Sequence, residues 1–173
     1  MIRLRMLPLF AFASLLQALP TQTQALQLAY PGCSFTRKEF FLSDGQAARV
    51  KALSGVDLQG LWFVGYEARK DGHLEGVGFF DTHRVRTENE TALVAVGADG
   101  ALKRVEVIAF REPQDYAPRQ AWLDQFQGKA LDAHLSLKRD IRPLAGATLT
   151  ANALTDASRR GLALWQVFYG TAK

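Results

Sequence analysis

The sequence contains few of the residues that build disulfides, metal centres or hydrolase active sites. Cys33 is the only cysteine among 173 residues, so no disulfide can form within one chain. The three histidines, His73, His83 and His134, are far apart, and none has the one-turn spacing of paired helical metal ligands. The pattern Gly-x-Ser-x-Gly does not occur. These absences disfavour a disulfide scaffold, a metal centre and hydrolase chemistry.

The charge excess is small and is concentrated at the N-terminus. The formal net charge is +4, and the first residues include two arginines followed by an apolar run over residues 6–16. Small and polar residues come next, with Thr23 and Ala25 at the −3 and −1 positions of a cleavage site. This layout predicts a secretory signal peptide over residues 1–25, because the apolar run is short for a membrane span. An uncleaved anchor is the alternative interpretation.

Cleavage after Ala25 removes two arginines and no acidic residue, which lowers the net charge from +4 to +2. So small an excess gives no case for a nucleic-acid partner. The expected location is the periplasm or the outer side of the cytoplasmic membrane.

The middle of the chain carries two β-hairpin signals. "LWFVGYEARKDGHLEGVGFFD" places apolar runs on both sides of Asp71-Gly72, and "ETALVAVGADGALKRVEVIAF" repeats the device at Asp99-Gly100. Asp-Gly between apolar runs is a strong signal for a tight hairpin turn. We therefore expect four antiparallel strands.

Helical patterns surround this region. Ser43 or Asp44 is a candidate N-cap for a short helix that ends at Gly55, and "RQAWLDQFQG" predicts another that stops at Gly128. The last helix has an apolar face of Leu154, Ala157, Gly161, Trp165 and Phe168. The predicted fold class is α+β, a twisted antiparallel sheet of hairpins with helices packed on one side. Residues 26–59 are expected to form an N-terminal extension with a short helix, and residues 60–173 the main domain.

The stretch "LAGATLTANALT" enters the last helix through small residues. Ala145, Gly146 and Ala147 let a ligand approach the backbone closely. A helix that starts at about Thr150 directs free N–H groups and its positive dipole end to the same place, which favours an anion such as phosphate. Thr150 is the expected N-cap, so the hydroxyl of Thr148 is left over. A plain helix cap and an anion site both remain open at this point.

"AGATLTANALTDASRR" resembles the motif of the FMN-binding domain family, which also occurs in the flavin-carrying subunits of the Rnf and sodium-pumping NADH:quinone oxidoreductase complexes. The resemblance extends in order through "GVGFFDTHRVRTENETALVAVGADGALKRVEVIAFREPQDY", "WLDQFQGKALD" and "RDIRPLAGAT", roughly residues 60–168. In that family a flavin transferase, with FAD as donor, joins the phosphate of FMN to the threonine that ends the motif. The resemblance implies that residues 60–173 are an FMN-binding domain.

Carried over by position, the resemblance makes Thr148 the FMN attachment residue, with Gly146, Ala147, Leu149 and Thr150 around the phosphate. Two residues depart from the motif. At the position of Ala145 the motif prefers serine or threonine, and at the position of Arg142 it often has an acidic residue. A flavin ring needs a mostly apolar slot with a few polar groups. The residues expected to form it are Tyr116, Trp122 and Phe126 as walls, and His83, Arg84, Glu112 and Lys129 at its polar edges.

The resulting hypothesis is an exported electron-transfer protein with FMN joined to Thr148 by a phosphoester, rather than a stand-alone enzyme. The expected partners are a flavin transferase for maturation and redox proteins or a quinone at the membrane. The alternative is an exported binding or interaction module of the same fold, with non-covalent FMN or no cofactor.

Overall fold

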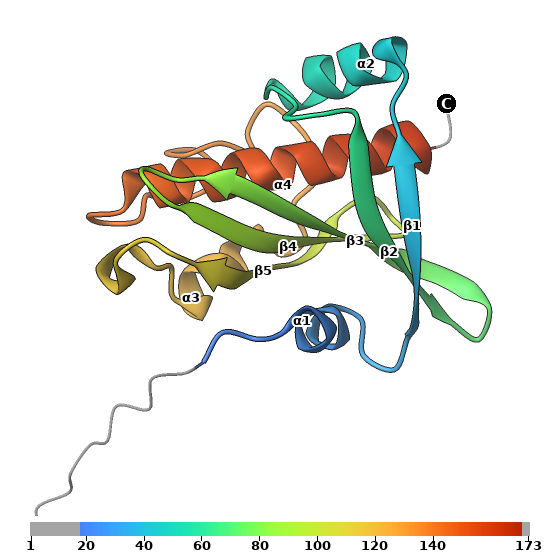
Figure 1. Ribbon diagram of the computed structural model, residues 1–173, viewed down its shortest axis with the longest axis horizontal. Helices are drawn as coiled ribbons and strands as arrows, with labels where there is room; N and C mark the ends of the chain where they lie inside the picture. The colour runs from blue at the N-terminus through green and yellow to red at the C-terminus, as the bar shows by residue number, and fades with distance from the viewer. Residues whose placement is uncertain (1–17, 171–173) are drawn as a thin grey trace, which may run out of the picture.

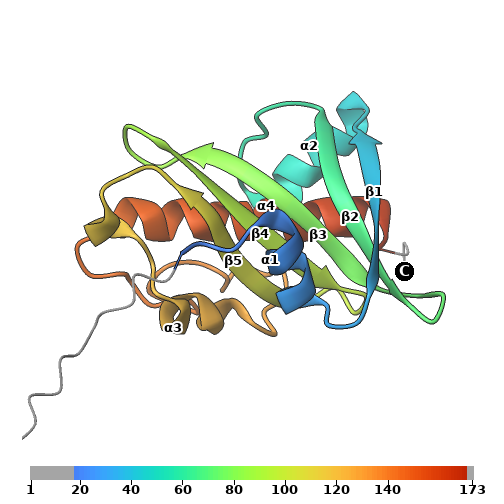
Figure 2. The ribbon, with the colours of Figure 1, turned by 60° about the horizontal axis from the view of Figure 1, so that its bottom comes forward.

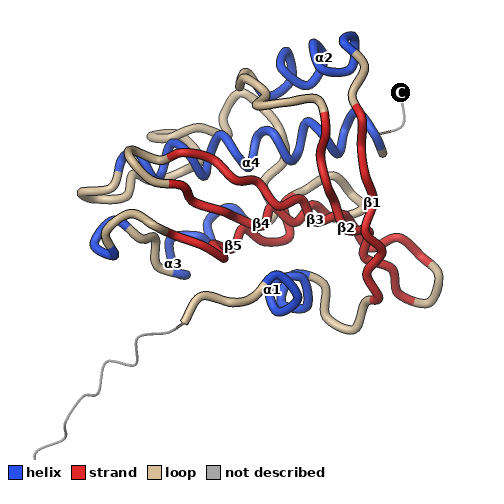
Figure 3. Tube along the Cα trace, viewed as in Figure 1, coloured by secondary structure: helices blue, strands red, loops and turns tan. Residues whose placement is uncertain are grey.

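The computed structural model describes residues 18–170 and has a five-stranded antiparallel sheet at its centre (Figures 1 and 3). The strand order in space, β1-β2-β3-β4-β5, is the order in sequence, so each strand pairs with the next one along the chain. The strands are β1 (Ser34–Phe41), β2 (Trp62–Lys70), β3 (His73–Arg84), β4 (Asn89–Gly97) and β5 (Leu102–Phe110). The α+β class predicted from the sequence is confirmed.

Both predicted hairpins are present. Asp71 and Gly72 connect the paired residues Lys70 and His73, and both have a positive φ, 51° and 81°. Two positive φ values in a two-residue loop are typical of the type I′ turn, whose twist matches that of the strands. At the second hairpin only Gly100 needs the left-handed region, with φ 81°. These local turns set the register of both hairpins.

The prediction of four strands was wrong, because β1 also belongs to the sheet. β1 pairs with β2 along its whole length, from Ser34 opposite Arg69 to Phe41 opposite Trp62. It is an edge strand in which only Phe40 is buried, and it carries Arg37, Lys38 and Glu39 in its middle. Charged residues are common on exposed edge strands. In β1 they interrupt the alternation of apolar and polar residues by which a strand is recognised in a sequence. β1 therefore joins the predicted N-terminal extension to the sheet.

Helices α2 (Asp44–Ser54) and α4 (Thr148–Phe168) cover one face of the sheet (Figure 1). α2 has the predicted boundaries: Ser43 and Gln46 form a capping box, and Gly55 ends the helix with φ 69°. α4 buries Leu154, Ala157 and Gly161 against the strands, as predicted. The main hydrophobic core lies between α4 and the sheet.

The expectation that all helices pack on one side fails for α1 (Gln22–Ala29), which lies on the opposite face (Figure 2). Ala25, Leu26 and Ala29 are buried there against Ala68, Leu93 and Ala95, which form a second apolar surface on the sheet. The Tyr30 hydroxyl donates to the Val96 carbonyl at 2.9 Å. The sequence gives no sign of this, because α1 falls partly inside the predicted signal peptide.

The predicted cleavage point after Ala25 lies in the middle of α1, and Thr21 with Gln24 forms its capping box. Residues 1–17 of the predicted signal peptide lie outside the described residues. Within the described part of the chain, no helix has the length and apolar character needed to cross a membrane.

The connection between β5 and α4 is mostly irregular. It contains the short helices η1 (Gln114–Tyr116), α3 (Gln120–Leu123) and η2 (Asp124–Phe126). Within the described residues, an isolated parallel bridge joins Leu137 and Ile141 in this connection. Ile141 and Leu135 anchor this connection in the core.

Candidate functional site

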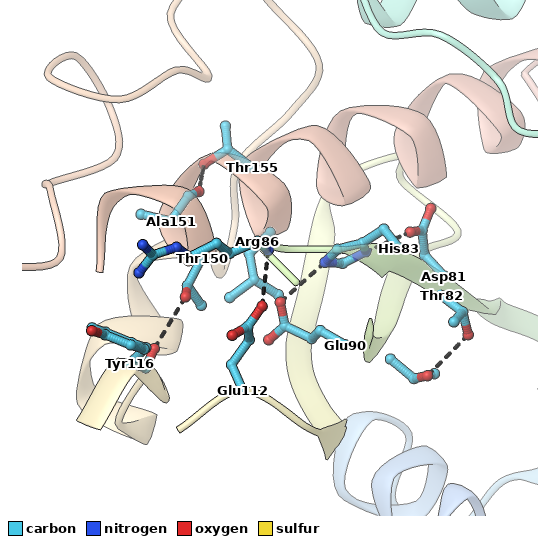
Figure 4. Close-up of polar contacts among 12 residues, drawn as sticks. Asp81, Thr82, His83, Arg86, Glu90, Glu112, Tyr116, Thr150, Ala151 and Thr155 are labelled. Carbon is cyan, nitrogen blue, oxygen red and sulfur yellow. Dashed lines mark hydrogen bonds and ion pairs between the residues drawn. The ribbon is translucent and has the colours of Figure 1, made fainter. Parts of the chain in front are cut away.

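A cleft of about 180 Å³ lies at the N-terminal end of α4. Its walls come from three separate parts of the chain: the turn after β3, the segment after β5, and the first turn of α4 (Figure 4). The lining residues are Val85, Arg86, Glu112, Tyr116, Gly146, Ala147, Thr148, Leu149 and Thr150. The stretch singled out in the sequence therefore forms one side of a real cleft.

The first turn of α4 has no side-chain cap. The N-cap residue is Ala147, with φ −129° and ψ 48°, and the first helical residue is Thr148. The first intrahelical bond runs from the Ala151 N–H to the Ala147 carbonyl at 3.1 Å. The N–H groups of Thr148, Leu149 and Thr150 thus belong to the free donors that every helix leaves at its N-terminus. They lie in the wall of the cleft.

The prediction that Thr150 caps α4 was wrong. The helix begins two residues earlier than expected, so Thr150 lies inside the first turn, where its hydroxyl donates to the Tyr116 carbonyl at 3.1 Å. Gly146 makes the early start possible, because its φ of +76° belongs to the left-handed region. The Thr150 hydroxyl therefore ties α4 to η1, and the exposed Thr148 side chain remains available at the cleft.

Glu112 holds the opposite wall in place. Its Oε1 accepts the backbone N–H groups of Arg86, Thr87 and Glu88 at 3.0, 2.6 and 2.8 Å. Backbone hydrogen bonds, with the one from Glu88 the strongest, hold the pKa of Glu112 below its ordinary value. The carboxylate stays ionised and fixes the turn that carries Arg86. Figure 4 shows the Arg86 side chain extended toward the first turn of α4.

Seven of the predicted site residues meet at this cleft, and they are Glu112, Tyr116, Gly146, Ala147, Thr148, Leu149 and Thr150. Val85 and Arg86 were not among the predicted site residues. β3 ends at Arg84, and the chain turns there. That turn brings Val85 and Arg86 into the same wall.

The other six predicted residues lie elsewhere. Phe126 is fully buried in the main core, so it does not line the cleft, and Trp122 packs against it with its indole N–H donated to the Arg142 carbonyl at 2.9 Å. Lys129 pairs with Asp140 at 3.2 Å. Of the three predicted aromatic wall residues, only Tyr116 lines the cleft, because α3 turns its apolar side toward the core.

Ala145 and Arg84 are exposed and lie outside the lining of the cleft. The Arg84 Nε donates to the Arg86 carbonyl at 3.3 Å, so this arginine braces the turn after β3. His83 is buried.

His83 belongs to a buried charge network under α4. Its Nδ1 is 2.8 Å from Asp81 Oδ1 and its Nε2 is 3.0 Å from Glu90 Oε2. Arg160 of α4 holds Asp81 with two hydrogen bonds, at 2.7 and 2.8 Å (Figure 4 shows the strand residues). Burial by itself lowers the pKa of His83, but the bonds to both carboxylates outweigh it and raise the pKa to about 9.

The two acids of this network respond in opposite directions. Burial would raise the pKa of Asp81, but its bonds from His83 and Arg160 bring it down to about 2. For Glu90 burial prevails, and its pKa is raised. The side chain of Glu90 is completely buried, and its Oε1 has no hydrogen-bond partner in the described chain. Only the i, i+2 alternation of Asp81 and His83 along β3 was visible in the sequence.

These features define an α+β protein whose cleft combines a free helix N-terminus, an arginine and an exposed threonine. Comparison with models of protein families and with curated proteins gave no match.

Proposed function

We propose that this chain is an exported electron-transfer protein that holds FMN at the cleft, with the phosphate joined to Thr148 Oγ1. The observation that carries the proposal is the convergence of three free N–H groups, the Arg86 side chain and the exposed Thr148 hydroxyl on one cleft. Each of these groups favours a phosphate, and a helix N-terminus is a common phosphate site.

The donor set fits a phosphate even though a carboxylate lines the same cleft. Glu112 has its charge taken up by three backbone N–H groups of the turn after β3. It therefore does not compete for the N–H groups of α4, which come from a different element. An added Cβ at Gly146 would meet no atom within 4 Å, so the backbone beside Thr148 is open to a ligand. Of the parts of FMN, the phosphate group has the strongest support from the residues of this cleft.

The rest of the cleft offers a shallow apolar surface for a ring. Tyr116 and Leu149 flank the threonine, and Leu149 is half exposed, a large apolar side chain left at the surface. Bound FMN would supply the redox chemistry, and the protein would set its position and electrostatic surroundings. The chain's own contribution is to bind the phosphate, orient it with Arg86, and hold the cleft walls through Glu112 and Thr150.

Covalent loading needs an exposed nucleophile, and Thr148 is exposed. Forming the ester joins Thr148 Oγ1 to phosphorus with loss of the hydroxyl proton, and with FAD as donor the pyrophosphate bond breaks and AMP leaves. A flavin transferase is the proposed maturation partner. Redox proteins or a quinone at the membrane are the proposed electron partners.

The test is to co-express the full chain with a flavin transferase and examine the denatured protein for flavin fluorescence and for an FMN mass adduct. We expect the adduct in the native sequence and its loss in Thr148→Ala. Thr155→Ala is the matched control, because it removes another hydroxyl of α4, one that bonds the Ala151 carbonyl and lies outside the lining of the cleft. We expect this control to keep the adduct.

Three outcomes contradict parts of the proposal. An adduct that survives in Thr148→Ala shows that another residue carries the flavin. Colour that is lost on denaturation shows non-covalent FMN and rejects the ester. Absence of flavin from the native sequence, folded and denatured, rejects the FMN function.

A further inference from the structure

The sheet splits between β2 and β3, and the split forms a second cavity. The pairing of β2 with β3 runs only from Gly65 opposite Phe79 to the turn at Lys70 and His73. Beyond it, residues 62–64 pair only with β1, and residues 80–84 pair only with β4. Figure 1 shows β2 following β1 while β3 diverges. We call the resulting cavity of about 280 Å³ the inter-strand slot.

The walls of the slot are largely aromatic. Trp62 and Phe63 line it from β2, and Phe79 and Phe80 line it from β3. Trp62 is half exposed, which is unusual for a large apolar side chain and leaves its ring open at the mouth of the slot. Leu164 of α4 adds an apolar contact at the floor. Such walls favour a flat, apolar ring system.

The edges of the slot carry free backbone groups. Leu42 donates its N–H to the Leu61 carbonyl at 2.8 Å, so the odd-numbered residues at this end of β2 bond toward β1. Since bonding directions alternate along a strand, the N–H and C=O groups of Trp62 and Val64 face the slot. They have no strand partner on that side. These groups offer hydrogen bonds at the rim of the ring system.

The floor carries a buried guanidinium with spare donors. Arg160 is only 6% exposed and lines the slot. Its Nε and Nη2 bond Asp81, whereas Nη1 has no hydrogen bond to any group in residues 18–170 and remains accessible to solvent. Because Arg160 lines the slot, Nη1 can donate to an acceptor oxygen of a ligand that replaces water there.

We propose that the inter-strand slot is a second binding site, which takes a neutral planar aromatic carbonyl compound whose oxygen accepts a hydrogen bond from Arg160. The ligand is neutral because the charges beneath the slot are already paired: Asp81 bonds both Arg160 and His83, and His83 also bonds Glu90. A carboxylate there would be an uncompensated buried charge. Arg160 lies three turns along α4 from Thr148, about 18 Å away, so this site is separate from the cleft.

The experiment is a titration of the flavin-free full chain with 2-acetylnaphthalene, followed by NMR shifts and Trp fluorescence. We expect shifts at the Trp62 indole, the Leu164 methyl groups and the Arg160 guanidinium, and little change at Thr148. Trp62→Ala should weaken binding about tenfold, because it removes one aromatic wall. Phe41→Ala is the matched control: Phe41 is also an exposed aromatic residue, pairs with Trp62, and does not line the slot. It should leave the affinity unchanged.

The charge of the ligand and the role of Arg160 are tested separately. We expect 2-naphthoate, of the same ring shape, to bind at least tenfold more weakly than the ketone. Arg160→Lys should weaken the ketone; if that variant does not fold, the guanidinium shift in the native chain decides the contact. Shifts centred on Tyr116 and Thr148, equal losses in Trp62→Ala and Phe41→Ala, tighter binding of the carboxylate, or no binding at all would each overturn the proposal. None of these results depends on FMN.

Discussion

His83 is the histidine that the fold takes into its interior, while His73 and His134 stay exposed. Its ring lies between two carboxylates, and both ring nitrogens have a partner. A histidine in this position is held in its charged form well above its ordinary pKa. Its charge is therefore coupled to the free energy of unfolding over an accessible pH range.

We expect stability to fall as the pH rises from about 6.5 through about 9, because the pKa of His83 is raised to about 9 in the folded state. The folded state binds this proton more tightly than the unfolded state, so the contribution is complete below the unfolded pKa. It amounts to about 3 kcal/mol. Glu90, whose pKa is also raised, acts with the same sign at lower pH. Urea unfolding measured across this range checks the slope.

His83→Gln should lose most of this pH dependence and unfold more easily at neutral pH, since Glu90 would keep no cationic partner. His73→Gln is the control, because that side chain is exposed at the start of β3. Equal slopes in the native chain and in His83→Gln would show that another group is responsible.

Among the elements, α4 lies very close to β4, and Gly161 allows this approach. A Cβ built at Gly161 would lie 2.6 Å from Val94 Cγ1 and 3.0 Å from Val94 Cβ. At this point α4 and β4 lie too close together to leave room for an added side-chain atom at residue 161. The contact joins the middle of α4 to the centre of β4, and both residues also line the inter-strand slot.

Gly161→Ala is expected to lower the free energy of unfolding by about 1–3 kcal/mol, because overpacking outweighs the gain in helix propensity. Gly45→Ala in α2 is the matched control, since an added Cβ there meets nothing within 4 Å. We expect that variant to be unchanged or stabilised by up to about 1 kcal/mol. Thermal unfolding of both variants decides; a stabilised Gly161→Ala would contradict the close packing.

At the opposite face, Tyr30 fastens α1 to β4 through its bond to the Val96 carbonyl. Tyr30→Phe keeps the ring and removes this buried hydrogen bond, so we expect a loss of about 1–1.5 kcal/mol. Tyr66→Phe is the comparison, because Tyr66 lies near the same surface and is only partly buried. Chemical denaturation measures both, and equal losses would remove the special role of the Tyr30 hydroxyl.

For the molecule as a whole, α1 closes the second face of the sheet, and the predicted cleavage point cuts through it. A chain that starts at Leu26 lacks the Thr21 cap and the buried Ala25. We expect it to be at least about 2 kcal/mol less stable than a chain that starts at Leu19, through loss of the cap and of apolar burial. Urea unfolding of the two purified chains tests this. Equal stability would mean that α1 contributes little.

Much of the fold was accessible from local patterns. The two Asp-Gly hairpins, the capped helix ending at Gly55 and the apolar face of α4 each depend on residues close in sequence, and all are present. β1 and α1 were missed because an edge strand is mostly exposed and a short helix gains its stability from packing. The start of α4 was misplaced because Gly146 lets the chain enter the helix without a side-chain cap.

The candidate sites divide in the same way. "GATLT" marked one wall of the cleft, since small residues, hydroxyls and a helix start are neighbours in the chain. The opposite wall with Glu112 and Arg86, the Asp81–His83–Glu90–Arg160 network and the split between β2 and β3 join segments that lie far apart in sequence. Turn-forming residues and hydrophobic periodicity determine local structure over a few residues, so they can be recognised from the sequence. Which distant side chains meet depends on strand register and helix packing, and these are set only when the whole core assembles.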